Sequence, residues 1–191
     1  MGVENDWNGR AQDSYPYRPG RPEGLLAPGE GSAIETLIAQ AVSGATTRVR
    51  VASMVTSSPA ILTALKDRID AKVDFKGVYD EGETQDVLSQ WEHSATGAPK
   101  VALAKAVLAK MVAKDSQHFN PKATDGAHNF MHDKIVVADD MLVTGSFNFS
   151  ANAAHNAENV LALQNADLAQ AYASYIDTLV ARYSGSAPPA S

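Results

Sequence analysis

The sequence contains no cysteine, so neither disulfide bonds nor thiolate chemistry can contribute to its fold or function. It also has no run of about 18 apolar residues, and therefore predicts no helix that spans a membrane. Basic residues are in the minority, because 16 Lys and Arg are set against 22 Asp and Glu, a formal net charge of -6. This balance argues against a protein that binds nucleic acid mainly by covering its phosphates with cations, although it does not exclude a local basic patch.

The remaining composition is typical of one globular domain. The chain has 191 residues, of which 45% are hydrophobic and 20% charged, and is long enough to bury a substantial core. Residues 1–26 are polar and rich in proline and glycine, lack the apolar stretch of a signal peptide, and predict an extended arm. We expect a domain over residues 27–184 and a flexible tail over residues 185–191. The sequence thus indicates a soluble protein and leaves its cellular compartment open.

Helical and strand patterns alternate along the domain. Ser32, followed three residues later by Glu35, predicts the start of a first helix, and Pro59 opens a second. Further helices are expected over residues 84–91, 101–113 and 167–183. Alternating or continuous apolar runs predict strands over residues 48–55, 72–79, 134–138, 142–146 and 158–163. This order predicts an α/β fold, a mixed β-sheet flanked by helices on both faces.

The segment HDKIVVADDMLVTGSFN, residues 132–148, places reactive side chains at the ends of an apolar run. His132 and Lys134 are two residues apart, so on a strand they point to the same face. The apolar residues between Lys134 and Asp139 indicate a central strand that is covered on both faces. Asp139 falls on the other face or in the turn, and we expect it to be a structural partner rather than a substrate contact.

The length of the turn after this strand decides whether Ser146 and Asn148 join the same site. A two-residue turn made of the consecutive aspartates would send both side chains to the wrong face, and Asp-Asp is a poor type I′ turn. A three-residue loop over residues 139–141 would pair Lys134 with Ser146 and His132 with Asn148, so that all four polar groups share one face. We expect the three-residue loop.

Such a set of groups suits a phosphate ester. An imidazole can attack phosphorus or carry a proton near neutral pH. A lysine and neutral donors such as Ser and Asn offset the charge on the phosphoryl oxygens. This chemistry needs neither a metal ion nor a cofactor. A metal site formed by His128 and His132 is disfavoured, because in an extended chain their Cα atoms would lie roughly 13 Å apart.

The pattern H-x-K, four residues, D, then G-S-x-N resembles the signature of the phospholipase D superfamily. Its first half matches His132, Lys134 and Asp139, and its second half matches residues 145–148. Five residues separate the two halves where the family usually has six, a difference that the hairpin loop can absorb. The helix and strand pattern before the motif is also similar to the opening unit of the family.

The resemblance implies a phospholipase D-like fold over about residues 27–183. It also implies a metal-independent phosphodiesterase that works through a phosphohistidine on His132, without a cofactor. Glu158 sits where members of the family carry an acidic residue that orients this histidine. The predicted catalytic residues are therefore His132, Lys134, Asp139, Ser146, Asn148 and Glu158.

Members of the superfamily use two such motifs per active centre, one histidine as the nucleophile and the other as the acid that protonates the leaving group. This sequence has one motif. The resemblance thus implies either a homodimer, as in the small bacterial endonucleases of the family, or the C-terminal half of a longer two-motif enzyme. A non-catalytic module with the same fold is the alternative from a different class. A nucleic-acid or phospholipid substrate, and hydrolysis or transfer, are all compatible with the sequence.

Overall fold

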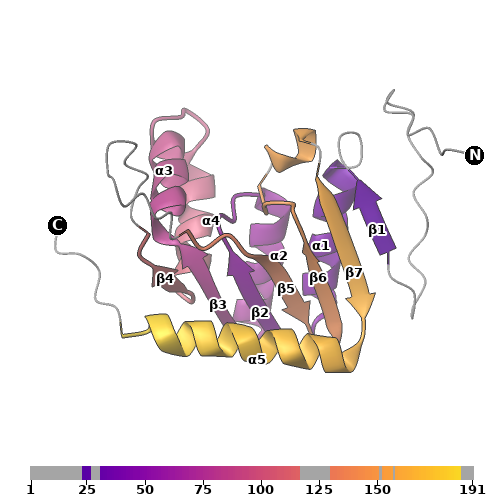
Figure 1. Cartoon of the computed structure of the whole chain (residues 1–191). Coiled ribbons are helices and arrows are strands. Elements are labelled where there is room, and N and C mark those ends of the chain that lie inside the picture. The colour runs from indigo at the N-terminus through magenta and orange to yellow at the C-terminus, as the bar shows by residue number, and fades with distance from the viewer. Residues whose placement is uncertain (1–22, 27–30, 117–129, 151, 157, 186–191) are drawn as a thin grey trace, which may run out of the picture.

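The computed structural model describes residues 23–26, 31–116, 130–150, 152–156 and 158–185. In this part of the chain a 7-stranded sheet has the order β1-β7-β6-β5-β2-β3-β4 (Figure 1). Its strands are β1 (Glu23–Leu26), β2 (Arg48–Ser53), β3 (Asp74–Asp80), β4 (Val112–Lys114), β5 (Lys134–Ala138), β6 (Met141–Gly145) and β7 (Asn159–Gln164). The helices are α1 (Gly31–Gly44), α2 (Pro59–Asp70), α3 (Glu81–Glu92), α4 (Ala98–Leu108) and α5 (Ala166–Tyr183), with a short 3-10 helix η1 (Ala153–His155).

The sheet combines a parallel half and an antiparallel half. β2, β3 and β4 run parallel to one another, with α2 between the first two and α3 and α4 between the second and third. β5 is antiparallel to β2, and β6, β7 and β1 continue the antiparallel half. The ends of β2, β3 and β6 and the starts of β5 and β7 therefore share one edge of the sheet, the upper edge in Figure 1.

Helices cover both faces of the sheet. α1, α2 and α4 pack on one face, and α5 crosses the other (Figure 1). Alternate residues of β5 enter the two resulting apolar cores, so that Val136 packs with the first set of helices and Val137 packs under α5. All residues of β5 are buried, as the apolar run predicts for a central strand. The predicted α/β fold, a mixed sheet with helices on both faces, is confirmed.

Two segments differ from the expected secondary structure. Residues 23–26, which we assigned to the N-terminal arm, form β1 and pair with β7. Val112–Lys114, in part expected to end a helix, form β4, because α4 stops at Leu108 and the chain then pairs with β3. Short strands gain stability from pairing with a neighbour more than from local propensity, which explains why the sequence does not reveal them. Residues 1–22 and 186–191 of the expected arm and tail lie outside the described residues.

The hairpin between β5 and β6 has a two-residue turn, and our expectation of a three-residue loop was wrong. Val137 pairs with Leu142 and Ala138 pairs with Met141, which leaves residues 139 and 140 for the turn. Asp139 has a φ of 52°, the positive value that tight hairpin turns need at their first central position. Aspartate tolerates this conformation better than most residues.

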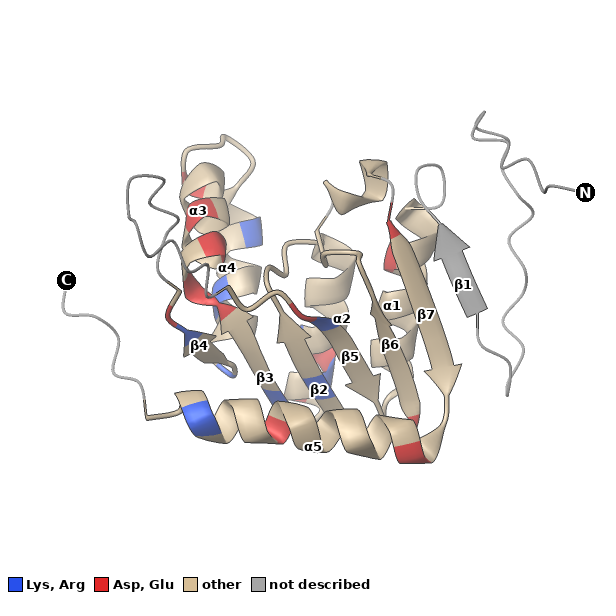
Figure 2. Cartoon of the chain, viewed as in Figure 1, with Lys and Arg blue, Asp and Glu red and all other residues tan. Residues whose placement is uncertain are grey.

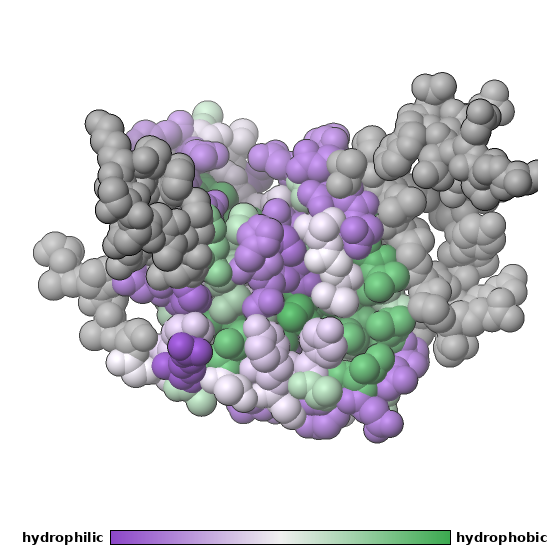
Figure 3. Space-filling view, viewed as in Figure 1, coloured by the Kyte–Doolittle hydropathy of each residue, from purple (hydrophilic) through white to green (hydrophobic). Residues whose placement is uncertain are grey.

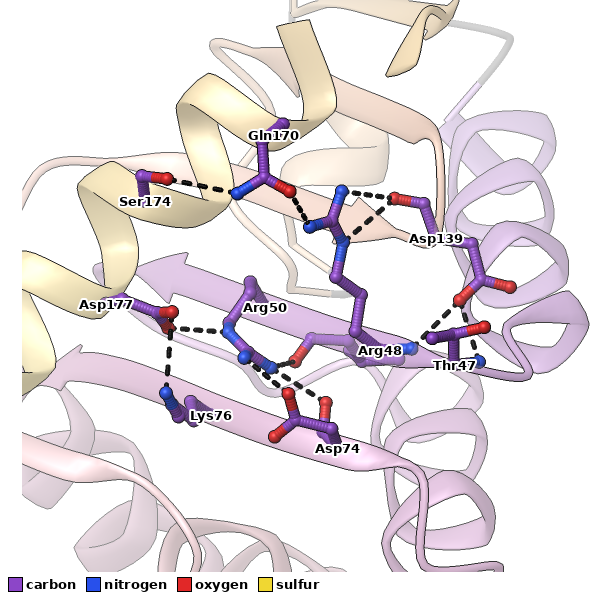
Figure 4. Close-up of polar contacts among 10 residues, drawn as sticks. Thr47, Arg48, Arg50, Asp74, Lys76, Asp139, Gln170, Ser174 and Asp177 are labelled. Carbon is purple, nitrogen blue, oxygen red and sulfur yellow. Dashed lines mark hydrogen bonds and ion pairs between the residues drawn. The ribbon is translucent and has the colours of Figure 1, made fainter. Parts of the chain in front are cut away.

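Arg50 of β2 anchors α5 to the sheet (Figure 4). Its side chain is buried and binds Asp74 of β3 and Asp177 of α5, each at 2.6 Å. Lys76 adds a second ion pair to Asp177 at 3.4 Å. The hydrogen bond from Arg50 lowers the pKa of Asp74, against a smaller opposing effect of burial. The position of α5 on this face therefore depends on a buried guanidinium with two carboxylate partners.

We expect Arg50→Met to lower the free energy of unfolding by about 2 to 4 kcal/mol, between the usual values for exposed and buried ion pairs. The variant keeps an apolar stem and leaves two carboxylates without their common partner. Urea denaturation at pH 7 measures the change. Because the pKa of Asp74 is depressed below its ordinary 3.8, its contribution is present above that pH. This contribution disappears as the pH falls through the folded-state pKa, so the difference between the two proteins should narrow in acid.

The matched control is Lys66→Met, which removes an exposed i,i+4 ion pair with Asp70 on α2. This change should cost about 0.5 kcal/mol or less. Equal losses in the two variants would show that Arg50 is not a special anchor.

Candidate active site

Most of the predicted site residues lie at the upper edge of the sheet. His132 and Lys134 stand at the start of β5, Ser146 and Asn148 follow the end of β6, and Glu158 directly precedes β7. The antiparallel order of these three strands brings the residues to one edge although they span 27 positions of sequence, from 132 to 158. Ser146 and Asn148 follow the last paired residue of β6, so the two-residue turn does not keep them from this edge, as we had expected it to. The edge therefore collects an imidazole, an ammonium group, a hydroxyl, an amide and a carboxylate.

The His132 side chain is exposed and has no hydrogen bond to another described residue. Its backbone, by contrast, is held on both sides. Lys134 Nζ donates to the carbonyl oxygen of His132 at 2.8 Å, and Met54 N donates to the carbonyl oxygen of Asp133 at 3.1 Å. The side chain of Met131 is buried in the apolar core under α5. The imidazole is thus presented to solvent from a fixed backbone.

Lys134 is buried, with 6% of its surface exposed. Burial lowers its pKa, while the negative charges of Glu158 and Asp133 act in the opposite direction. A poorly solvated ammonium group of this kind interacts more strongly with an anion than an exposed lysine does. Lys134 is therefore suited to bind a phosphoryl oxygen beside His132.

Ser146 and Glu158 form a hydrogen-bonded pair. Ser146 Oγ donates to Glu158 Oε2 at 2.5 Å and accepts from Asn159 N at 3.0 Å. Gly145 makes this close approach of β6 and β7 feasible, since a Cβ atom there would lie 2.1 Å from the carbonyl oxygen of Asn159. The hydroxyl proton of Ser146 is engaged by Glu158, and among the described residues Glu158 has no hydrogen bond to His132. Its carboxylate lies near Lys134 instead.

Asn148 has a polar atom without a partner. Its Oδ1 atom is buried and accepts no hydrogen bond within the described part of the chain. Buried polar atoms in this state are rare in folded proteins, and an amide oxygen can be satisfied only by a hydrogen-bond donor. The amide of Asn148 is therefore available to a ligand at this edge.

A groove of about 500 Å³ opens beside His132. β5 and β6 form one wall, α5 forms the other, and residues 132–134 lie along it. α5 contributes Tyr172 and Tyr175, and the hydroxyl of Tyr175 donates to Asp133 Oδ2 at 3.1 Å. Burial, assisted by the charge of Asp133, raises the pKa of Tyr175, so its phenol stays protonated in the neutral range. The groove can hold an organic group that is attached to a phosphate at His132.

Exposed apolar side chains lie on one side of the groove. Leu161 of β7 is 44% exposed, Leu168 of α5 is 41% exposed and Tyr175 is 43% exposed. Figure 3 shows hydrophobic surface on this face of the molecule, above α5 and over the antiparallel half of the sheet. Neither β6 nor β7 carries a charged residue along its length (Figure 2). The site therefore borders a surface that can exclude water when another molecule covers it.

Asp139 lies at the opposite end of β5 from His132, in the hairpin turn. Its carboxylate accepts hydrogen bonds from the backbone amides of residues 46–48, at 2.8 to 2.9 Å, and from the hydroxyl of Thr46 at 3.1 Å. Partial burial disfavours the charged form, but these donors outweigh it and lower the pKa of Asp139 (Figure 4). The structure thus places Asp139 outside the candidate site, in the structural role that its sequence position suggested, so its inclusion among the predicted catalytic residues was wrong.

The sequence did not point to the tyrosines of α5 or to Asp133 as part of the site. Tyr175 is 42 positions from Asp133, and only the packing of α5 across the sheet brings them together. The one signal that could have identified Asp133 is its position inside the motif, between His132 and Lys134. Within the described residues, no three His, Asp or Glu side chains are grouped closely enough to hold a metal ion. His128, considered above as a ligand, lies outside them.

Comparison with known proteins assigns the chain to a class. A model of the family described as "Cardiolipin synthase, PLD-like domain" matches residues 38–180. This match covers most of the chain, and the observed fold is consistent with the family. The chain belongs to the phospholipase D superfamily. No curated protein matches the sequence significantly.

Solved structures share the fold at low sequence identity. Nuc from Salmonella typhimurium, a phospholipase D family member, is 24% identical with a TM-score of 0.59, over 85% of this chain and 96% of Nuc. NucT from Helicobacter pylori is 16% identical with a TM-score of 0.58, over the same shares of the two chains, 85% and 96%. Phosphatidylserine synthase from Haemophilus influenzae is 13% identical with a TM-score of 0.54, over 83% of this chain and 36% of the synthase. Across the described ranges, the helices are too short or too polar to cross a bilayer.

The placement of Asp139 leads to a stability prediction. Asp139→Asn should destabilise the fold at pH 7, because an uncharged amide binds the donors of residues 46–48 less strongly, by about 1 to 3 kcal/mol. The wild-type advantage should be complete at pH values above 3.8 and should vanish as the pH falls through the depressed folded-state pKa. Thermal unfolding of both proteins between pH 2 and pH 7, a range set around the ordinary aspartate pKa, measures this. A difference that persists unchanged at the acid end would contradict it.

Proposed function

We propose that the chain is a phosphodiesterase in which His132 attacks phosphorus without the help of a metal ion. The observation that carries the proposal is the exposed imidazole of His132 on a fixed backbone, next to the buried ammonium group of Lys134. Membership of a superfamily of phosphodiesterases supports it.

The reaction would proceed in two displacements. In the first, an imidazole nitrogen of His132 forms a bond to phosphorus, the bond from phosphorus to the leaving oxygen breaks, and a general acid protonates that oxygen. In the second, water or an alcohol attacks the phosphohistidine, gives up its proton to the same acid–base group, and releases His132. Hydrolysis and transfer differ only in this acceptor.

Lys134 and Asn148 would bind the phosphoryl group during both steps. The positive charge of Lys134 stabilises the charge that develops on the nonbridging oxygens. The Nδ2 group of Asn148 would donate a hydrogen bond to a nonbridging oxygen, whereas its buried Oδ1 atom, an acceptor, would need a separate donor. Glu158 would place a negative charge near Lys134. Its hydrogen bond from Ser146 would keep the ends of β6 and β7 together.

The substrate would be a phosphodiester of a nucleic acid or a phospholipid. In either case the organic group on one ester oxygen enters the groove between the sheet and α5, against Tyr172 and Tyr175. The apolar border of the groove favours an aromatic ring or an apolar group over a second charged one.

We expect His132→Ala to remove phosphodiesterase activity, with a loss of at least about 1000-fold in kcat, because the nucleophile is absent. Hydrolysis of bis(p-nitrophenyl) phosphate measures it. The exposed His132 packs no core, so the melting temperature should change little. The matched control His93→Ala, at the exposed end of α3, should retain full activity.

Activity of the wild-type protein should persist in excess EDTA, since no metal takes part in either displacement. Strict dependence on added divalent metal would overturn the metal-free mechanism. A folded wild-type protein that cleaves no diester would favour the non-catalytic module.

The general acid of the first step would be a second histidine. With one motif in this chain, that histidine comes either from a second copy or from another polypeptide that carries the other motif. The exposed apolar surface of Leu161, Leu168 and Tyr175 lies beside the groove and fits such an interface. We favour a homodimer in which two copies of His132 face one phosphorus.

A mixing experiment tests this assembly. If each active centre needs both copies of His132, equilibration with an equal amount of His132→Ala chains should lower the activity per wild-type chain to about one half, because half of these chains then occupy inactive heterodimers. Leu161→Asp, a change at an exposed position, should give an inactive monomer by sedimentation. Unchanged activity per wild-type chain in the mixture, or an active monomer, would rule out the shared centre.

A further inference from the structure

Asp80, at the end of β3, is a buried acidic residue that the proposed reaction does not use. It is 0% exposed and ends its strand at the same upper edge as His132. Asp80 is also the N-cap of α3, where its Oδ1 atom accepts a hydrogen bond from Glu83 N at 3.1 Å. Capping uses one of the two carboxylate oxygens, and the other points elsewhere.

The second oxygen of Asp80 connects two separate segments of chain. Oδ2 accepts a hydrogen bond from Met131 N at 2.8 Å and another from the hydroxyl of Ser116. Serine or asparagine would cap α3 as well as aspartate does, so capping alone does not require a carboxylate here. A carboxylate is the group that can accept at all these donors at once.

Met131 directly precedes His132. The pairing of β5 with β2 begins only at Lys134, which faces Ser53. On the C-terminal side of His132 the backbone is held by the bonds from Lys134 and Met54 described above. On the N-terminal side, the bond from Met131 N to Asp80 Oδ2 holds the backbone next to His132. Because the imidazole itself has no hydrogen bond among the described residues, its place depends on these backbone contacts.

We propose that Asp80 is a positioning residue for His132, acting through the backbone amide of Met131. The inference rests on the proposed function, because it assigns Asp80 a part in aiming the nucleophile. Displacement of a nucleophile by about 1 Å can lower the reaction rate on the order of 100-fold. A hydrogen bond that fixes the backbone next to His132 can therefore affect the rate. The same carboxylate binds both the first turn of α3 and the amide of Met131. It thereby links the His132 segment to the parallel half of the sheet.

Two variants separate positioning from capping. Asp80→Ser retains a good helix cap but is too short to reach Met131, and Asp80→Asn keeps the size but lacks one acceptor. Each should lower kcat for bis(p-nitrophenyl) phosphate by about 10- to 100-fold and leave KM within about twofold, because substrate binding is retained while the attack geometry is lost. Ser116→Ala removes the other donor to the same oxygen and should leave kcat within about threefold.

Amide hydrogen exchange provides a readout that is independent of activity. Exchange at Met131 should accelerate in Asp80→Ser, and stay slow in Ser116→Ala. The amide of Leu168, which the Asn165 cap of α5 holds in the same way, should be unchanged in both and serves as the internal control. The ring resonances of His132 should broaden or shift in Asp80→Ser and not in Ser116→Ala.

The outcomes separate the two proposals. A folded Asp80→Ser protein with wild-type kcat, or with unchanged exchange at Met131, would overturn the positioning role. A fall in melting temperature with equal losses in kcat and in binding would also overturn it, as a purely structural effect. If the wild-type protein cleaves no diester, the proposed function fails, and the exchange and ring resonances still decide whether Asp80 fixes the His132 segment.

Discussion

The burial of β5 is the constraint on which the site depends. This strand pairs with β2 on one side and β6 on the other, and helices cover both of its faces. A strand in such a place can carry charged side chains only at its ends or where charged partners are within reach, as for Arg50 of β2. Lys134 at the start and Asp139 just beyond the end occupy these positions. The motif that looks continuous in sequence is therefore divided by the length of a strand into a reactive end and a structural end.

The reactive end owes its chemistry to uneven burial. Lys134 is almost fully enclosed, while His132, two residues earlier, is exposed. The enclosed cation interacts strongly with an anion, and the exposed imidazole can approach phosphorus without first breaking a hydrogen bond to another described residue. In the proposed function, this local arrangement would let a chain with a net charge of -6 bind a phosphate, because nearby groups rather than the total charge set the field at the site.

α5 links the stability of the fold to the shape of the groove. The helix is held through Asp177 by the buried Arg50, and the same helix presents Tyr172 and Tyr175 to the groove. Tyr175 in turn bonds to Asp133, between the two reactive residues of the motif. The Arg50 anchor and the wall of the groove therefore belong to one helix, although the anchor itself lies away from the upper edge.

Local patterns in the sequence predicted most of the helices and strands, including the central strand, and the proposed reactive pair His132 and Lys134. These features follow from periodicity and from the motif, which involve residues close in sequence. Tertiary structure alone decided the two-residue turn, because the positive φ of Asp139 is stabilised by amides of residues 46–48, more than 90 positions away. It also decided the short strand β4 and the contact of Tyr175 with Asp133, since each depends on a neighbour chosen by packing. The sequence thus determined which functional groups the chain contains near the proposed site. Tertiary packing decided which of these groups contact one another, because a hydrogen bond between two distant segments leaves no pattern in the sequence of either segment.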